Sequence, residues 1–242
     1  MSAERLDRLL SRLGYATRRE VRALIRERRI EVKGVARPRP DTKVRAGDVR
    51  LDGAPLEDAG PLVIALYKPA GWICDRVPHD RHVFMLLPER WQRRRPPLSV
   101  AGRLDRDAEG LVILSDDGQL VHRLTHPRWH VPRVYRVRFA GALAEDAEAR
   151  VAEGMKLEGE AKPLRPAVLR RIGEREVELE LSEGRYHQVK RMIAALGGRV
   201  VSLRREAIGG LRLADLGLAP GEYRKLDAEM LARIGVSDRL PV

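Results

Sequence analysis

The sequence is poor in cysteine, in aromatic residues and in long apolar runs. Its single cysteine, Cys74, excludes an internal disulfide and a zinc site built from several cysteines. The longest apolar run, residues 62–67, is too short to cross a bilayer, and the start, MSAERLDRLL, lacks the apolar core of a secretion signal. No GxxxxGK[ST] or GxGxxG pattern occurs, so a nucleotide cofactor has no support. Together these absences predict a cytoplasmic protein.

Acidic residues are also outnumbered. The 242 residues include 47 lysines and arginines against 35 acidic residues, which gives a formal net charge of +12. Such a charge attracts polyanions, and the planar arginine fork suits phosphate oxygens. A basic surface without a specific partner is the alternative, but the patterning of the arginines favours nucleic acid. A hydrophobic content of 43% allows a packed core, and the length fits one large domain and a small one.

Residues 1–58 have the pattern of a small domain. A first helix ends near Gly14, and a second begins with a capping box formed by Thr17 and Glu20. Short strands with glycine turns follow. Arginines spaced four, four and three residues apart are predicted to share one face of the second helix: Arg18, Arg22, Arg26 and Arg29. A solvated helix face without a partner is the alternative explanation. The position of the four arginines on one face favours RNA binding.

This stretch resembles an S4 domain, a small RNA-binding module. The resemblance rests on the R-L-D near the start, the arginine-lined helix and EVKGVARPRPDTKVRAGDVRLDG. It implies binding to structured RNA. A linker is predicted at residues 59–61, followed by a second domain over residues 62–242.

The second domain alternates strands and helices. VIALYK, GLVILS, RVYRVRF and EVELELS read as strands, the last with Val177, Leu179 and Leu181 on one face. YHQVKRMIAALGG reads as a helix whose core face is predicted to consist of Val189, Met192, Ile193 and Leu196. WQRRRPPL, residues 91–98, is predicted to be a basic loop. The pattern predicts an α+β fold with a mainly antiparallel mixed sheet flanked by helices.

One stretch, AGRLDRDAEGLVILSDDG at residues 101–118, surrounds a short apolar strand with acidic residues: Asp105, Asp107, Glu109, Asp116 and Asp117. The pair before Gly118 has ordinary turn chemistry, and Asp107 and Glu109 fit a solvated loop. Asp105 differs because it leads into a buried strand. A carboxylate there is predicted to be partly buried and to need a cation nearby.

Three chemistries could use this acid. A glycoside hydrolase would pair Asp105 with Asp107 or Glu109. A metal-dependent nuclease would use Asp105 and Asp107 as magnesium ligands. A nucleophilic mechanism needs one carboxylate beside a cation and an aromatic ring.

The same stretch closely resembles the catalytic motif of pseudouridine synthases. YKPAGWIC, EGRYHQVKRM and REAIGGLRLADLGLAPGEYRKL agree with three further segments of that family. The histidine and lysine of EGRYHQVKRM are similar to the RsuA type, the bacterial small-subunit (16S) rRNA branch. The resemblance implies isomerisation of one uridine to pseudouridine, with base flipping and without metal, redox carrier or other cofactor.

The resemblance also implies roles for individual residues. Asp105 matches the family's nucleophile, attacking either C6 of the base or C1′ of the ribose. Lys190 matches the basic residue that pairs with it and keeps it ionised. Tyr135 matches the tyrosine that stacks on the uracil and could relay the C5 proton, although a packing tyrosine is the alternative.

RNA-binding roles follow for neighbouring residues. Arg103 matches the arginine that fills the gap left by the flipped base, and a salt bridge to Asp105 or Asp107 is compatible with this. A second set is expected to hold RNA phosphate or the loop geometry at a helix N-terminus: His187, Gln188 and Arg191. One departure is Asp75, where a small hydroxyl residue is expected.

Other predictions concern metals and partners. His122, His126 and His130 recur every four residues, but two nearby prolines interrupt a helix, so no metal site is predicted. The predicted partner is 16S rRNA, within a partly assembled small subunit, bound by a monomer. The same chemistry on 23S rRNA and a non-catalytic rRNA-binding or assembly factor are the alternatives.

Overall fold

The computed structural model describes residues 3–235, which form two compact units. The first unit runs to Leu62 and also takes in Leu87–Ser99. The second consists of Val63–Leu86 and the chain from Val100 onward. No helix in this described stretch is long and apolar enough to cross a membrane.

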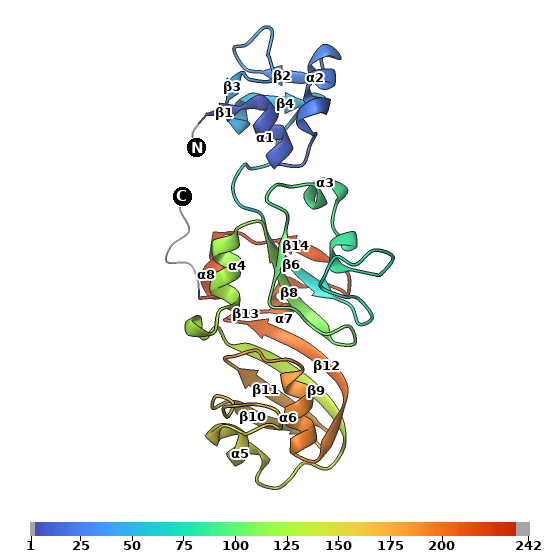
Figure 1. Ribbon diagram of the computed structural model, residues 1–242, viewed down its shortest axis with the longest axis vertical. Helices are drawn as coiled ribbons and strands as arrows, with labels where there is room; N and C mark the ends of the chain where they lie inside the picture. The colour runs from blue at the N-terminus through green and yellow to red at the C-terminus, as the bar shows by residue number, and fades with distance from the viewer. Residues whose placement is uncertain (1–2, 236–242) are drawn as a thin grey trace. The chain divides into compact units, whose positions relative to one another are not determined.

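Short helices and strands build the first unit (Figure 1). Its elements are β1 (Glu4–Arg5), α1 (Leu6–Arg12), α2 (Arg18–Arg26), β2 (Ile30–Val32), β3 (Lys43–Val44), β4 (Val49–Leu51), β5 (Ala54–Pro55) and α3 (Glu89–Gln92). Antiparallel pairing joins β1 to β3 and forms a three-stranded sheet in the order β2-β4-β5. Leu9, Val21 and Val49 belong to one buried cluster of this unit. The predicted order of two helices followed by short strands is confirmed.

Helix α2 begins with the predicted capping box. The Thr17 hydroxyl accepts a hydrogen bond from the backbone N–H of Glu20 at 3.3 Å, and the Glu20 carboxylate accepts one from the backbone N–H of Thr17 at 2.6 Å. Two N–H groups that a helix start leaves without intrahelical partners are thereby satisfied. Three of the predicted arginines lie exposed along this helix: Arg18, Arg22 and Arg26.

Arg29 does not continue that row, so this part of the prediction is wrong. Helix α2 ends at Arg26, and Arg28 adopts a left-handed backbone conformation with a φ of 56°. The Arg29 guanidinium instead donates to both carboxylate oxygens of Asp52, at 2.7 and 2.8 Å. The predicted spacing required the helix to continue as far as Arg29, but it ends at Arg26 and a turn follows at Arg28.

The predicted basic loop at residues 91–98 is partly ordered within the first unit. Trp91 lies in α3 and is buried. Arg94 is buried too, and its guanidinium donates to the carbonyl of Gly60 at 3.1 Å. The loop prediction is therefore wrong for Trp91 and Gln92, which lie in α3, while residues 93–98 form a loop whose Arg94 is buried because a carbonyl distant in the chain accepts its hydrogen bond.

A mixed sheet forms the centre of the second unit, with nine strands among the described residues. Seven follow the order β10-β11-β9-β12-β8-β6-β14, with β13 paired to β12 and β7 paired to β8. Their bounds are β6 (Val63–Lys68), β7 (Ser99–Ala101), β8 (Glu109–Ser115), β9 (Arg133–Gly141), β10 (Val168–Gly173), β11 (Glu176–Leu181), β12 (Gly198–Ile208), β13 (Leu211–Arg212) and β14 (Tyr223–Lys225). Along the seven-strand order only β12 and β8 pair in parallel. The predicted α+β fold with a mainly antiparallel mixed sheet is confirmed.

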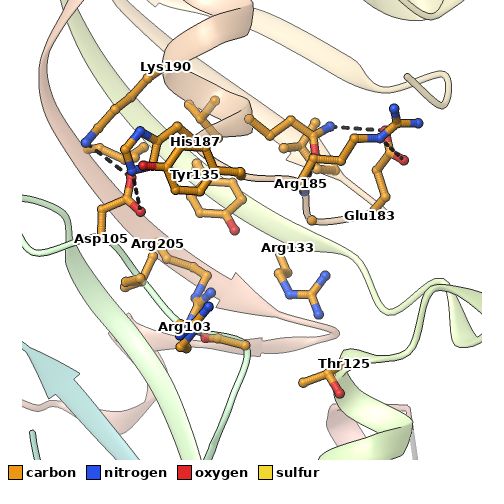
Figure 2. A pocket seen from close by; sticks show the side chains of 18 of the residues that line it. Arg103, Asp105, Thr125, Arg133, Tyr135, Glu183, Arg185, His187, Lys190 and Arg205 are labelled. Carbon is orange, nitrogen blue, oxygen red and sulfur yellow. Dashed lines mark hydrogen bonds and ion pairs between the residues drawn. The ribbon is translucent and has the colours of Figure 1, made fainter. Parts of the chain in front are cut away.

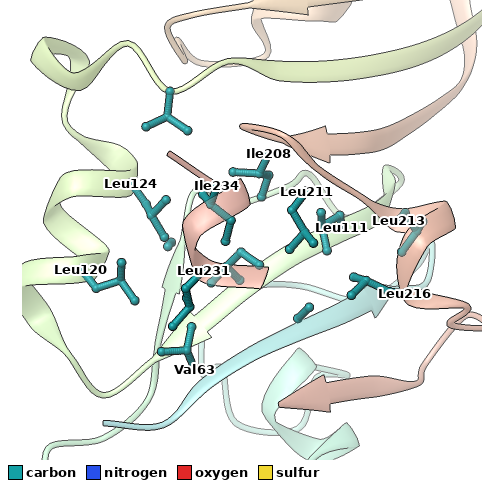
Figure 3. Packing of buried hydrophobic residues seen from close by; sticks show 14 of the residues in the cluster. Val63, Leu111, Leu120, Leu124, Ile208, Leu211, Leu213, Leu216, Leu231 and Ile234 are labelled. Carbon is teal, nitrogen blue, oxygen red and sulfur yellow. The ribbon is translucent and has the colours of Figure 1, made fainter. Parts of the chain in front are cut away.

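Helices flank this sheet (Figure 1). They are α4 (Gly118–Thr125), α5 (Ala147–Glu153), α6 (Gln188–Ala195), α7 (Leu213–Leu216) and α8 (Ala228–Arg233). Helix α5 packs against β10, and α6 packs against β12. Figure 3 shows Leu124 of α4 and Leu231 of α8 in one apolar cluster with Val63 and Leu111 of the sheet. This cluster anchors β8, the strand that follows the acidic loop.

Two predicted periodicities are confirmed. Val177, Leu179 and Leu181 are buried along β11, and the apolar face of α6 is buried.

Asp117 also has the structural role predicted for it, since its carboxylate accepts from the backbone N–H groups of Gln119 and Leu120 and caps α4.

Candidate active site

A buried lysine fixes the shape of the loop that carries Asp105. Lys68, at the end of β6, is fully buried, and its ammonium donates to the carbonyls of Pro69, Arg106 and Ala108 at 3.0, 3.2 and 2.6 Å. Burial lowers the pKa of Lys68 to about 8. Two of these carbonyls belong to residues one and three positions after Asp105. The lysine therefore fixes the backbone conformation of the loop there.

A buried arginine holds both ends of the same loop. Arg205 of β12 is 1% exposed, and it donates through Nε to the carbonyl of Leu111 at 2.6 Å and through Nη2 to that of Gly102 at 2.7 Å. In the parallel register, Arg205 lies opposite Gly110. Residues 102–111 are therefore held at both ends by Arg205 and in the middle by Lys68, each bonded to main-chain carbonyls.

Asp105 forms an ion pair with Lys190 of α6 (Figure 2). The Lys190 Nζ lies 3.1 Å from Asp105 Oδ2 and 2.6 Å from Asp107 Oδ1. His187 Nε2 lies 3.5 Å from Asp105 Oδ1. Burial lowers the pKa of Lys190, but its hydrogen bonds to Asp107 and Asp105 outweigh burial and raise that pKa above its usual value. The same contact lowers the pKa of Asp107, so a cationic lysine faces a carboxylate on either side.

The structure thus brings together the predicted pair of Asp105 and Lys190, while the part played by Asp107 was missed. Asp107 was predicted to be solvated, or to be a magnesium ligand or the second acid of a hydrolase. In the structure its side chain is 72% exposed, in agreement with the solvated prediction, and it also shares the lysine. Nothing in the local sequence indicates this bond to a helix residue 83 positions later.

Tyr135 is the third predicted catalytic residue, and it lies in the same cavity (Figure 2). It is buried in β9, between Leu179 of β11 and Arg205 of β12. The cavity has a volume of about 500 Å³ and is also lined by Asp105 and Lys190. This volume falls within the usual range of small-molecule sites, so a single nucleotide fits it.

Two predicted side chains at the start of α6, His187 and Gln188, differ in their contacts. His187 has a left-handed backbone with a φ of 48°, and its ring stacks on Tyr186 with centroids 3.9 Å apart. Gln188 is buried, accepts from the backbone N–H of Arg185 and donates to Glu183. These bonds give Gln188 a part in the loop geometry, the second of the two roles expected for it.

Arg191 is also engaged within the protein. Its guanidinium donates to the Glu160 carboxylate and to the Glu158 carbonyl, both at 2.6 Å. Arg103 forms an ion pair too, at 2.8 Å from Asp75. The expected salt bridge of Arg103 to Asp105 or Asp107 is therefore wrong. Asp75, the residue that departs from the family pattern, is its partner.

The candidate metal ligands do not gather. In the described part of the chain, no three His, Cys, Asp or Glu side chains are placed to hold a metal ion. Helix α4 ends at Thr125, so His126 and His130 lie beyond it.

Comparison with known proteins identifies the family of the chain. The family model of RNA pseudouridylate synthase matches residues 62–195, and that of the S4 domain matches residues 4–55. The chain belongs to the RNA pseudouridylate synthase family. The synthase is 42% identical over 234 residues to "Ribosomal small subunit pseudouridine synthase A" of Yersinia pestis, covering 96% of this chain and 98% of that one. The protein of the same name from Escherichia coli (strain K12) is 41% identical over 235 residues, covering 95% and 99%.

A solved structure agrees with this assignment. A structure titled "Crystal structure of pseudouridylate synthase" superposes with a TM-score of 0.66 at 34% identity and covers 96% of this chain and 99% of that chain. The synthase is thus an isomerase that acts on uridine in RNA. Its S4 domain contains the arginines that lie exposed on α2.

No role was predicted from the sequence for two residues that shape the site of the synthase. Lys68 lies within the quoted YKPAGWIC and Arg205 begins REAIGGL, yet neither received a role. A usable signal existed for Lys68, which is the single cation in an otherwise apolar strand, but not for Arg205, whose strand also contains Arg199 and Arg204. Such a cation requires carbonyl or carboxylate partners. The partners themselves could not be named from the sequence.

Proposed function

We propose that this synthase converts one uridine of 16S rRNA to pseudouridine, with Asp105 as the nucleophile. The relatives that match nearly the whole chain have names that specify the small ribosomal subunit. The observation that carries the role of Asp105 is its ion pair with Lys190 beside Tyr135, in a cavity of nucleotide size. A carboxylate must be ionised to attack, and an adjacent ammonium favours the ionised form.

The proposed reaction divides the work among these residues. Asp105 adds either to C1′ of the ribose or to C6 of the base, and the C1′–N1 bond breaks with its electron pair passing to the uracil. The uracil turns while stacked on Tyr135 and rejoins the ribose through C5. The carboxylate leaves, the C5 proton is lost through the Tyr135 hydroxyl, and N1 gains a proton. Product and substrate have the same composition, so the sum needs no redox partner.

The remaining roles concern RNA binding. Arg18, Arg22 and Arg26 in residues 1–58 bind rRNA phosphates, and residues 62–242 carry the catalysis after a linker at 59–61. Arg103 is exposed and held by a single ion pair, so it is free to exchange Asp75 for RNA and fill the gap left by the flipped base. We propose a cytoplasmic monomer that acts on rRNA within a partly assembled small subunit.

The test is a map of pseudouridines in rRNA by carbodiimide-stop sequencing. Cells that lack the protein are compared with cells complemented by the wild type, by Asp105→Asn or by Glu145→Gln. Glu145 is an exposed acid of the same unit and serves as the control. We expect one 16S site to be lost and to be restored by the wild type and Glu145→Gln only.

Each other outcome revises a stated part of the proposal. A lost 23S site would keep the chemistry and overturn the choice of rRNA. An unchanged map would overturn the rRNA substrate and favour a binding role. For purified protein, RNA affinity of Asp105→Asn should stay within about tenfold of the wild type, since many phosphate contacts contribute. Retained turnover in that variant would exclude Asp105 as the nucleophile.

A further inference from the structure

Two buried guanidinium groups lie in the floor of the cavity, apart from the Asp105–Lys190 pair (Figure 2). Arg133, at the start of β9, is 6% exposed, and Arg205 is 1% exposed. Both line the cavity with Tyr135. The two cations are close enough that the charge of Arg205 adds to burial in lowering the pKa of Arg133.

Neither arginine has an acidic partner among residues 3–235. Arg133 donates through Nη2 to the carbonyl of Leu124 at 2.7 Å, and its buried Nε has no hydrogen-bond partner. Arg205 donates only to two main-chain carbonyls. Lys68 shows that main-chain carbonyls can hold one buried cation, but here two buried cations lie close together, and the charge of one adds to the cost of burying the other. A negative charge between them would offset that cost.

Asp105 does not supply that charge. Its two carboxylate oxygens are directed to Lys190 and His187, and it forms no ion pair with either arginine of the floor. In Figure 2 the Asp105 carboxylate points toward Lys190 and His187. In the described part of the chain no ion pair supplies this anion, so a bound anion would compensate both cations.

Gly102 leaves space in front of these guanidinium groups. A Cβ at this position would lie 3.5 Å from Arg133 Nε and 3.8 Å from Arg205 Nη1. Its φ of +84° is also one that side-chain-bearing residues rarely adopt. The backbone is therefore bare at the point where both guanidinium groups approach it, as expected where a ligand group comes close.

We propose that Arg133 and Arg205 form an anion subsite that binds a phosphate of the target nucleotide. The substrate is RNA, which brings one phosphate for each nucleotide that enters the cavity. Guanidinium N–H groups match phosphate oxygens in geometry and charge. The subsite fixes the nucleotide at its backbone while the uracil lies against Tyr135. The inference rests on the family's RNA substrate and is independent of which residue is the nucleophile.

The test compares three soluble probes: uridine, uridine 5′-monophosphate and uridine 3′-monophosphate. Their dissociation constants are measured from the rise in melting temperature at matched ionic strength. At least one monophosphate should bind about tenfold more tightly than uridine, the gain typical of a charge-assisted hydrogen bond. In Arg133→Gln this preference should fall to less than about twofold, while uridine binding stays unchanged.

Arg138→Gln is the matched control, because Arg138 lies exposed on the same strand, and it should keep the full preference. Equal binding of uridine and both monophosphates by the wild type would overturn the proposal, even if Arg133→Gln fails to fold. Equal weakening of all three probes in Arg133→Gln would instead assign the arginine to the uracil carbonyls. Arg133→Lys retains a cation and should keep part of the preference. If Arg138→Gln also lost the preference for monophosphate over uridine, the preference would be due to general surface charge and the proposed subsite would be wrong.

Discussion

Replacing Lys68 by methionine would remove the group that holds the Asp105 loop. Three hydrogen bonds from a charged donor would be lost, each contributing about 1.5–3 kcal/mol. Removing the ammonium also relieves the cost of a buried cation, which amounts to several kcal/mol. We expect the two effects to offset in part and the free energy of unfolding to fall by about 1–3 kcal/mol. Turnover should fall by about 100-fold, because a shift of about 1 Å at a reacting group has such an effect.

The pH dependence of stability gives a second readout for Lys68. Its pKa is about 8 in the folded protein, whereas an unfolded lysine titrates near 10.4. Between these two pH values the unfolded state binds more protons, so the lysine makes the free energy of unfolding rise with pH. Below about pH 8 the lysine is protonated in both states and adds no slope. In Lys68→Met this rise should be absent.

The assays are denaturant unfolding across that pH window and single-turnover pseudouridine formation on rRNA. Lys156→Met is the control, since Lys156 is an exposed lysine of the same unit. It should match the wild type in both assays. The reasoning would be refuted if Lys68→Met kept turnover within about threefold of the wild type, because a displaced loop cannot hold a reacting carboxylate in place. An unchanged pH slope would refute the buried cation.

Two further predictions concern the other unit and the sheet. Changing Arg18, Arg22 and Arg26 together to glutamine should make the slope of log affinity for rRNA against log salt shallower by about 2, with folding retained, and an unchanged slope in RNA titrations would contradict phosphate binding. Gly110→Ala should lower stability by about 1–3 kcal/mol, because its φ is +110° and a Cβ would lie 2.6 Å from the backbone nitrogen of Arg205. An unchanged melting temperature would contradict this close approach.

Periodicity predicted the elements that carry the site. The alternation in β11 and the apolar face of α6 are local patterns, and each is buried as expected. The capping box of Thr17 and Glu20 involves residues three apart, so it too could be predicted. Arg29 could not, because the turn at Arg28 depends on where β4 brings Asp52.

The same limit applied to buried charge. The burial of Arg94 in the predicted basic loop could not be foreseen, because its acceptor, the Gly60 carbonyl, is distant in the chain. Arg103 was expected beside its sequence neighbours, whereas it bonds to Asp75. In each case the fold decides which carbonyl or carboxylate lies near the long cationic side chain. The local sequence does not specify that partner.

What the sequence by itself determined is the α+β pattern, the basic character and the family motifs that single out Asp105, Tyr135 and Lys190. The first two follow from composition and from spacings within single elements, and the three residues follow from the resemblance to the family. Tertiary structure alone decided that Lys190 lies between two carboxylates, that Lys68 holds the middle of the loop and that Arg205 holds its two ends. The reason is physical: each cation is satisfied by atoms from other strands and loops, and only the packing of the sheet brings those atoms within hydrogen-bond distance.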